Sequence, residues 1–319
     1  MKPAKLNTAI VEEKKLNSVS KAILKTLLYF DMFKHPLTSE EIFSYSQRHP
    51  IPPEEIGNEL KNLENEGYLN QKNNFFFLNN DESVIERRQK GKKCSEKYLT
   101  IAIKFSKLIA SFPFVEGVFL SGSLAKGYMD KETDIDYFII TKPGRLWFSR
   151  TLLVLFKKIF LLNSHKYFCV NYFIDSNNLE IPDKNIFTAT EIIFLIPTYN
   201  EKLYNDFINA NLWVSHYYPN FHRTPSERIL QERNPRVKKI VEKLFSKNIG
   251  EKSDALCFKI TLKFWKRKFK NFDKEQFDLN LRSRKNTSKH HPNEFQKKIL
   301  AQHGEKIAAF EKQFNLKLS

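Results

Sequence analysis

Glycine and cysteine are both scarce in this chain of 319 residues. Only 9 residues are Gly, which excludes a collagen-like repeat and disfavours a Gly-rich architecture of many strands. The three cysteines, Cys94, Cys169 and Cys257, form no C-x-x-C pair and no even set. This pattern argues against a disulfide framework and against a structural zinc site. It predicts a reducing, cytoplasmic location.

Long uninterrupted apolar runs are missing as well. The most apolar segment, residues 146–162, is broken by Arg150, Lys157 and Lys158. Its apolar run is therefore far shorter than the ~18 residues that a membrane-spanning helix needs. The opening residues, MKPAKLNTAIVEEKKLN, are too charged for a signal peptide. We predict a soluble chain without a membrane span.

Positive charge and phenylalanine, in contrast, are abundant. The formal net charge is +17, 29 residues are Phe, and 41% of the residues are hydrophobic, so packed cores are expected and global disorder is excluded. The charge excess is C-terminal, because residues 221–319 hold 25 Lys and Arg against 11 Asp and Glu, whereas residues 1–220 hold 28 against 25. Such a basic region either contacts phosphate groups or forms a solvated helical face.

The first 80 residues have the pattern of a small helical domain that ends in a hairpin. A helix follows Ser20, Thr38 and Glu41 have capping-box spacing, and Pro53 opens a third helix. Two short strands are predicted on either side of a turn at residues 72–74. This order of elements resembles a winged helix-turn-helix domain.

The helix that would read DNA in such a domain is acidic. Residues 53–66 carry five Glu and a single Lys, and repulsion from the phosphates makes such a helix a poor reader of a DNA groove. We therefore expect protein docking or an intramolecular role for this domain, and we do not expect duplex DNA as a partner. Residues 81–112 are predicted to form a connecting helix.

The most specific stretch is residues 117–141, GVFLSGSLAKGYMDKETDIDYFIIT. A strand runs into a Ser-Gly-Ser turn, and a helix begins directly after it. Gly122 permits a phosphate chain to approach the backbone, and Ser123 adds a hydroxyl and an amide at the helix N-terminus. Lys126, one turn into this helix, either contacts a phosphate or faces solvent.

Two aspartates open the next strand. Asp134 and Asp136 are two residues apart, so their side chains point to the same side and can hold a divalent cation together. The oxygen-liganded ion that most often bridges the oxygens of a triphosphate is Mg²⁺. The pattern therefore predicts a magnesium site next to a nucleoside triphosphate.

In residues 117–141 a strand leads into Gly-Ser, and ten residues later Asp-x-Asp precedes a second strand. This order resembles the nucleotidyltransferase fold of the DNA polymerase β superfamily, bacterial type. The resemblance implies an α+β fold with a small mixed-sheet core at residues 113–220. This core would follow a winged helix at 1–80 and a connecting helix at 81–112, and precede a basic helical region at 221–319. It implies Mg²⁺-dependent transfer of a nucleoside monophosphate from an NTP to a hydroxyl acceptor on a small molecule, protein or RNA.

In that family a third carboxylate on a neighbouring strand helps to hold two metal ions and activates the attacking hydroxyl. By resemblance, Asp134 and Asp136 form the first pair, and the third position falls in the predicted strand 166–175. There the chain has Asn171. Its amide oxygen can bind a metal, but Asn cannot act as a base.

Three outcomes follow from this departure. Asp175 could substitute, because it shares a strand face with Asn171 about 13 Å further along. Another residue, such as His165 or Glu180, could substitute instead. Otherwise the domain is a catalytically weakened nucleotide-binding regulatory or interaction protein.

A second basic feature is the stretch 282–292, RSRKNTSKHHP, which is predicted to be a loop before a C-terminal helix. Such a loop could close over a triphosphate or an acceptor phosphate through Arg282, Lys285 and Lys289. The alternative is an exposed basic linker. A DNA regulator with an appended nucleotide domain is disfavoured by the acidic helix at 53–66.

Overall fold

The computed structural model describes residues 15–47, 49–222, 235–291 and 294–318. Two compact units make up the chain. The first comprises Met1–Ile85, Ser215–His222 and Ile299–Ser319, and the second comprises Glu86–Val214 and Arg223–Lys298. The C-terminal residues thus belong to two different units, whereas the division into four consecutive regions remains a prediction.

Residues 15–47 and 49–85 of the first unit contain three short helices and a hairpin. These are α1 (Ser18–Asp31), α2 (Ser39–Ser44), α3 (Pro53–Asn65), β1 (Asn70–Lys72) and β2 (Phe75–Phe77). Thr38 and Glu41 form the reciprocal capping box in front of α2. The helices and the hairpin lie where the sequence places them, but the winged-helix assignment stays a prediction.

The first unit also includes most of α12 (Phe295–Phe314). The ring of Phe314 lies 4.9 Å from that of Tyr68, and the ring of His303 lies 5.2 Å from that of Tyr29. Residues far apart in the sequence therefore build one core in this unit.

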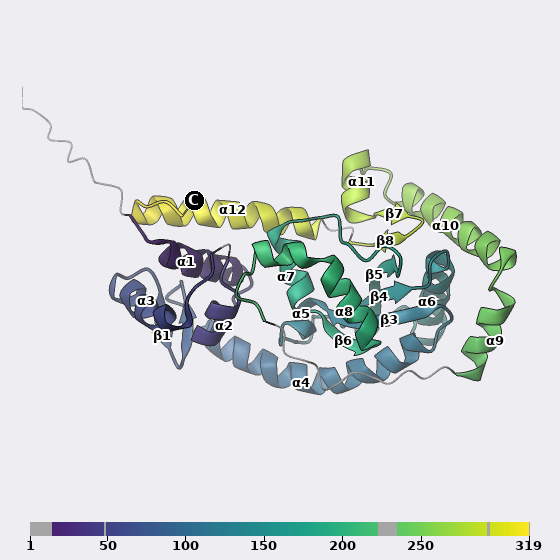
Figure 1. The fold of residues 1–319 in the computed structure, drawn as a ribbon, viewed down its shortest axis with the longest axis horizontal. Helices are drawn as coiled ribbons and strands as arrows, with labels where there is room; N and C mark the ends of the chain where they lie inside the picture. The colour runs from purple at the N-terminus through teal and green to yellow at the C-terminus, as the bar shows by residue number, and fades with distance from the viewer. Residues whose placement is uncertain (1–14, 48, 223–234, 292–293, 319) are drawn as a thin grey trace, which may run out of the picture. The chain divides into compact units, whose positions relative to one another are not determined.

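The second unit is built on a mixed six-stranded sheet in the order β6-β3-β4-β5-β8-β7. The strands are β3 (Val115–Ser121), β4 (Asp136–Thr141), β5 (Cys169–Asp175), β6 (Ile196–Tyr199), β7 (Ser283–Arg284) and β8 (Thr287–Lys289). Among the strands that the structure describes, only the pair of β4 and β5 is parallel. The mixed sheet together with the helices (Figure 1) confirms the predicted α+β class.

Helices cover both faces of this sheet. The helices of this unit are α4 (Ser83–Ala110), α5 (Gly122–Ala125), α6 (Leu146–Phe160), α7 (Ile186–Ile193), α8 (Glu201–Ala210), the 3-10 helix η1 (Leu212–His216), α9 (Arg236–Leu244), α10 (Asn248–Lys268) and α11 (Lys274–Asn280), of which α4 begins and η1 ends within the first unit. Val118 of β3 belongs to an apolar core with Trp147 of α6 and Trp265 of α10. On the other face, Phe207 of α8 contacts Phe119 and Phe138.

The apolar segment of α6 is a core helix. Leu146, Trp147 and Leu153 are fully buried there. Within the described ranges, no helix is both long and apolar enough to cross a membrane.

One sequence prediction for the second unit was wrong. The predicted loop at 282–292 contains the hairpin β7–β8, and β8 pairs with β5 through Phe173 and Ser288. Residues 196–199 form β6, a strand that was not predicted. Strands of two to four residues are too short to show a periodic pattern, and backbone pairing with a neighbouring strand decides their structure.

Candidate functional site

The residues of the Ser-Gly-Ser and Asp-x-Asp motifs meet at one edge of the sheet. Ser121 at the end of β3 is paired with Asp136 at the start of β4, and Asp136 is paired with Cys169 at the start of β5. Ile135, between the two aspartates, is fully buried, while Asp134 and Asp136 are half-buried. The alternation of the strand therefore keeps both carboxylates away from the core.

Gly122 is fitted against the carboxylate of Asp136. Its φ of +67° lies in the left-handed region, and a Cβ at this position would overlap Oδ2 of Asp136. Any residue other than Gly would therefore have to displace the carboxylate or the turn. The turn and the aspartate form one unit, which explains why the motif needs both.

The charges around Asp136 are unbalanced. Burial, followed by the carboxylates of Glu191 and Asp134, raises the pKa of Asp136 to about 6, against the opposing effects of the Cys169 thiol and Lys126. Three carboxylates thus gather at this half-buried position with one lysine nearby. A bound cation would relieve this repulsion.

Glu191 was missed by the sequence analysis, because nothing in the pattern of α7 distinguishes it from a surface residue. In the structure its Oε1 accepts a hydrogen bond from Nζ of Lys126 at 2.6 Å. The same Nζ lies 3.5 Å from the carbonyl oxygen of Gly122. Lys126 therefore lies beside the Gly122 turn, and it is engaged by a carboxylate.

A second group of ligand atoms lies at Asp134. Its carboxylate, a ring nitrogen of His165 and Sγ of Cys169 lie within 4.8 Å of one another, a spacing that could hold a metal ion. Burial and the ammonium of Lys157 lower the pKa of His165, which favours the neutral ring that binds metals. His165 was one of the residues considered for the third position, whereas Cys169 was not.

Asn171 is held in this cluster. It is the extra residue of a bulge in β5, because Tyr137 pairs with Val170 and Phe138 with Tyr172. Its Nδ2 donates to Sγ of Cys169 at 2.8 Å. The residue at the predicted third position is therefore next to Cys169, as a neutral amide.

The structure does not bring Asp175 or Glu180 to this cluster. Asp175 pairs with Thr141, five residues along β4 from Asp136, which corresponds to about 16 Å. Its Oδ1 accepts hydrogen bonds from the backbone of Asn177 at 3.1 Å and from Nδ2 of Asn178 at 2.7 Å. Asp175 thus caps a turn, and Glu180 is exposed in an ion pair with Lys184.

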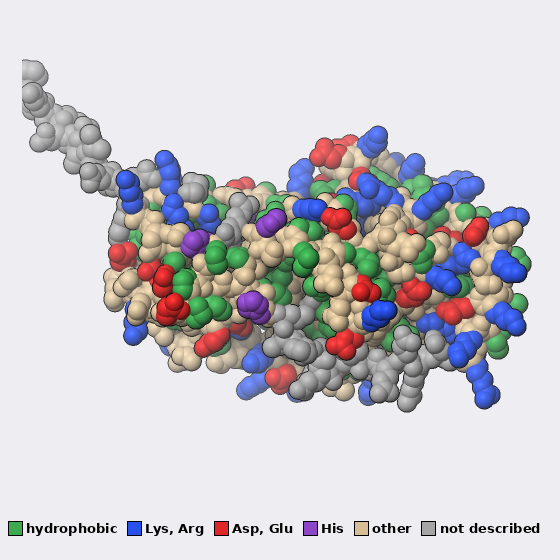
Figure 2. Space-filling model, in the orientation of Figure 1, with side chains coloured by type: hydrophobic (Ala, Val, Ile, Leu, Met, Phe, Trp, Pro, Cys, Tyr) green, Lys and Arg blue, Asp and Glu red, His purple; other side chains and the backbone are tan. Residues whose placement is uncertain are grey.

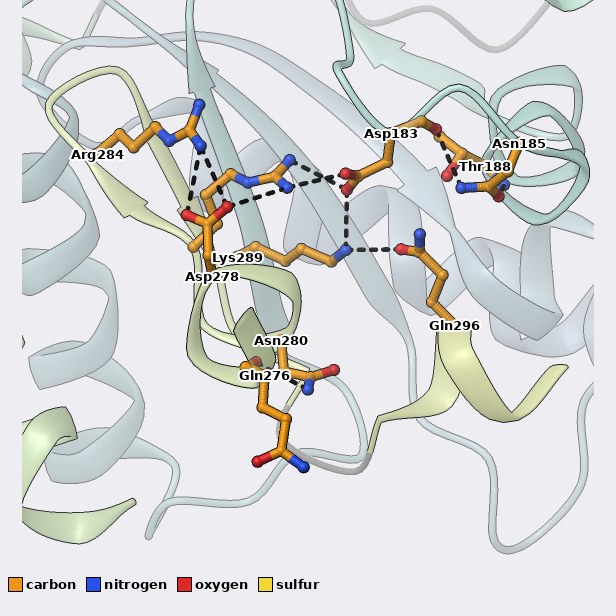
Figure 3. Close-up of polar contacts among 10 residues, drawn as sticks. Asp183, Asn185, Thr188, Gln276, Asp278, Asn280, Arg284, Lys289 and Gln296 are labelled. Atoms are coloured by element: carbon orange, nitrogen blue, oxygen red, sulfur yellow. Dashed lines mark hydrogen bonds and ion pairs between the residues drawn. The ribbon is translucent and has the colours of Figure 1, made fainter. Parts of the chain in front are cut away.

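Two of the three predicted phosphate ligands of the basic stretch are paired internally. Arg282 donates two hydrogen bonds, of 3.0 and 2.8 Å, to the carboxylate of Asp183. Lys289 lies 3.3 Å from the same carboxylate and donates to Gln296 at 2.8 Å (Figure 3). Both cations are about 95% buried. They stabilise the hairpin β7–β8 from within, which leaves them poorly placed to contact a nucleotide.

Asp183 is ionised in this arrangement. Burial alone would raise the pKa of its carboxyl, but the hydrogen bonds from Arg282 and the charge of Lys289 hold it below its usual value. The third predicted ligand, Lys285, is exposed in the turn between β7 and β8. Neither it nor the buried pair belongs to the cluster at Asp134 and Asp136.

Much of the remaining basic charge of the second unit is on its surface. Figure 2 shows Lys and Arg side chains gathered over α9 and α10. Exposed apolar side chains lie on the same helices, including Val237, Ile240 and Phe264. This region therefore presents both basic and apolar side chains to solvent.

Residues 103–196 match the family model of the nucleotidyltransferase domain. The chain therefore contains such a domain, of the DNA polymerase β superfamily. The match includes the Gly122 turn, the aspartate pair, Asn171 and Glu191, and it ends before the hairpin β7–β8. Domains of this type typically use divalent metal ions. No curated protein and no solved structure shows significant similarity to the chain.

Proposed function

We propose that the protein transfers a nucleoside monophosphate from an NTP to an acceptor oxygen and releases pyrophosphate. One observation carries the proposal: within the nucleotidyltransferase domain, the Gly122 turn is fitted against Asp136 beside Asp134. A Gly-Ser turn and two carboxylates on one strand are what binding of a metal-bound triphosphate requires.

The turn after β3 would bind the phosphate chain. The missing side chain of Gly122 and the hydroxyl of Ser123 allow phosphate oxygens to approach the backbone. Lys126 can add a cation at this point by exchanging its contact with Glu191 for a phosphate oxygen. The exposed fractions of these two side chains, 22% and 28%, leave both accessible from solvent.

The donor atoms fit a divalent cation. Asp134 and Asp136 supply the carboxylate oxygens that Mg²⁺ prefers, and the crowding of carboxylates around Asp136 favours a bound positive charge. When bound, Mg²⁺ would neutralise the phosphate charge and polarise the α-phosphate. His165 and Cys169 offer nitrogen and sulfur next to Asp134, so a softer ion such as Zn²⁺ is the competitor to test.

A hydroxyl is the acceptor group expected from the resemblance, and it can belong to a small molecule, a protein or an RNA. Activation of a hydroxyl normally uses the third carboxylate, and Asn171 cannot replace that function. This same observation favours a second candidate function, in which the domain binds nucleotide as a regulatory or interaction protein and transfers slowly or not at all.

Pyrophosphate release from each labelled NTP distinguishes the two functions. The purified protein is incubated with Mg²⁺, Mn²⁺ or Zn²⁺, with self-labelling followed in parallel. Asp134→Asn and Asp136→Asn should each abolish metal-dependent nucleotide binding, whereas Glu132→Gln, an exposed neighbour in the same loop, should leave it unchanged. Unchanged nucleotide affinity in Asp136→Asn would disprove the site.

Asn171→Asp tests the third position directly. If the wild-type protein binds nucleotide without releasing pyrophosphate and Asn171→Asp gains turnover, the regulatory function is supported. If the wild type already turns over and Asn171→Asp changes the rate little, the reaction does not depend on a base at this position.

A further inference from the structure

Arg150 is a buried cation for which the described part of the chain provides no counter-charge. It lies on α6 and is 8% exposed. Its guanidinium carbon lies 4.6 Å from the ring centre of Trp265 and 5.7 Å from that of Trp147. Among the described residues, no carboxylate and no hydrogen-bond acceptor contacts this guanidinium. An unpaired buried charge is costly, so the site favours an anion that is not part of the chain.

Lys157 is a second buried cation on the same face of α6. It follows Arg150 by seven residues, or about two helical turns, and is 6% exposed. Its Nζ lies 3.3 Å from Nδ1 of His165, and no carboxylate of the described chain pairs with it. Because seven residues correspond to about two turns, the two buried side chains leave α6 on the same side and border a common region.

His290 connects this region to the third position of the nucleotidyltransferase site. Its ring lies 4.9 Å from that of Trp265, on which Arg150 also packs. Its backbone N–H donates to the carbonyl oxygen of Asn171 at 3.0 Å. A histidine ring carries at least one N–H donor in either protonation state.

Arg150 is not completely enclosed. It keeps 8% of its surface exposed, and His290, whose ring packs on the same Trp265, is half-buried. A phosphate would approach the guanidinium through this exposed fraction.

We infer that Arg150, Lys157 and His290 form a binding site for a phosphate group carried by the acceptor. A phosphate supplies two negative charges and several oxygens, which match a guanidinium fork, an ammonium and an imidazole N–H. The inference rests on the proposed function, because it names the second substrate of that site as a phosphate-bearing compound.

The strand order separates this site from the expected triphosphate. Neighbouring strands of the sheet are ordered β3-β4-β5-β8. Gly122 follows β3 and Asp136 opens β4, whereas Asn171 lies in β5 and His290 follows β8. The aspartate therefore lies between the Gly-Ser turn and the cation site. On Lys157's side, His165 lies close to Asp134, so an acceptor bound there is next to the metal ligands.

Calorimetric titration with inorganic phosphate tests the site without metal or nucleotide. In buffer containing a chelator, the wild-type protein should bind one phosphate. Arg150→Gln and Lys157→Gln should each weaken this binding by about tenfold or more, since each removes a charge-assisted hydrogen bond. Lys158→Gln, an exposed neighbour on α6, should stay within about twofold. No phosphate binding by the wild type, or equal weakening by Lys158→Gln, would overturn the inference.

Thermal unfolding in phosphate-free buffer distinguishes binding from a structural role of Arg150. Arg150→Met should be at least as stable as the wild type, because it removes an uncompensated buried charge. Phosphate should raise the melting temperature of the wild type and not that of Arg150→Met. A lower melting temperature of Arg150→Met without phosphate would show that Arg150 is structural and would overturn the inference.

Repeating the phosphate titration with a saturating, non-hydrolysable NTP analogue and Mg²⁺ assigns the site to the acceptor. Simultaneous binding of phosphate and analogue supports the inference. Competition between them would place the phosphates of the NTP at these cations and overturn it. If the analogue does not bind at all, the proposed function fails, and the metal-free titration still decides whether the anion site exists.

Discussion

Two clusters of charged side chains in the second unit differ in how their charges are balanced. At the hairpin β7–β8, the carboxylate of Asp183 is paired with Arg282 and Lys289, and hydrogen bonds satisfy the buried group. At the edge of β4, burial and neighbouring carboxylates raise the pKa of Asp136 to about 6, and Lys126 opposes this only in part.

The difference shows what separates a structural charge cluster from a binding site. The sequence suggested phosphate contact at residues 282–292 because this stretch is basic, and it suggested a metal site at Asp134 and Asp136 because of their spacing on one strand. Internal pairing lowers the free energy of the folded chain and leaves little for a ligand to gain. Unbalanced charge raises that free energy and is relieved when a ligand of opposite charge binds.

Removing the charge of Asp183 should have the largest effect on stability. Asp183→Asn leaves Arg282 and Lys289 buried beside a neutral amide, and we expect a loss of about 3 kcal/mol or more in the free energy of unfolding. Asp278→Asn, at a carboxylate that is 48% exposed, should cost less than about 1 kcal/mol. Urea unfolding measures the loss of stability in both variants. Equal losses would mean that the ion pairs of Asp183 with Arg282 and Lys289 do not stabilise the fold.

A methyl group at Gly122 should have the largest effect on the site. Gly122→Ala places Cβ on the Asp136 carboxylate, and we expect nucleotide binding or turnover to fall by about 100-fold. Gly127→Ala is the matched control, because its φ is +72° but no atom lies within 4 Å of the added Cβ. Both variants should lose about 1 kcal/mol of stability, because alanine is unfavourable in the left-handed backbone region. Equal activity of the two variants would contradict the close fit of Gly122 and Asp136.

Acid should weaken the Asp183 cluster selectively. The pKa of Asp183 is held below its usual value, so its stabilising contribution is complete above the unfolded-state pKa of about 3.9 and is lost as the pH falls through the folded-state pKa. The difference in urea midpoint between the wild type and Asp183→Asn should therefore narrow below about pH 4. A difference that stays constant down to pH 2 would show that the charge of Asp183 contributes nothing.

Lys285 should have the smallest effect. It is exposed in the turn between β7 and β8, so Lys285→Gln should change stability by less than about 0.5 kcal/mol and nucleotide affinity by less than about twofold. Fluorescence titration with a nucleotide analogue measures the affinity. A large loss of nucleotide affinity would support the phosphate contact that the sequence predicted for Lys285.

Local patterns in the sequence predicted much of the fold. The capping box at Thr38, the strand before Gly122 and the strand after Asp136 are each set by neighbours a few residues away, and they form as expected. The strand β6 and the hairpin β7–β8 were missed, because their hydrogen-bond partners are distant in the chain and their residues show no alternation.

The same distinction applies to the residues of the candidate site. The spacing of Asp134 and Asp136 on one strand identified the carboxylate pair. Glu191 and Cys169 could not be identified, because they come from a different helix and a different strand and only the folded sheet brings them to Asp136. Lys157 was noticed only as a charge that interrupts an apolar segment.

The sequence by itself determined the motif of the nucleotidyltransferase domain and the change to Asn171, since both depend on residue type and short spacing. The tertiary structure decided which charges remain available. The pairing of β8 with β5 places Arg282 and Lys289 next to Asp183, whereas Arg150 is buried beside two indole rings and has no partner among the described residues. Charge is a property of the residue, but its pairing depends on distance and burial, which the fold alone sets.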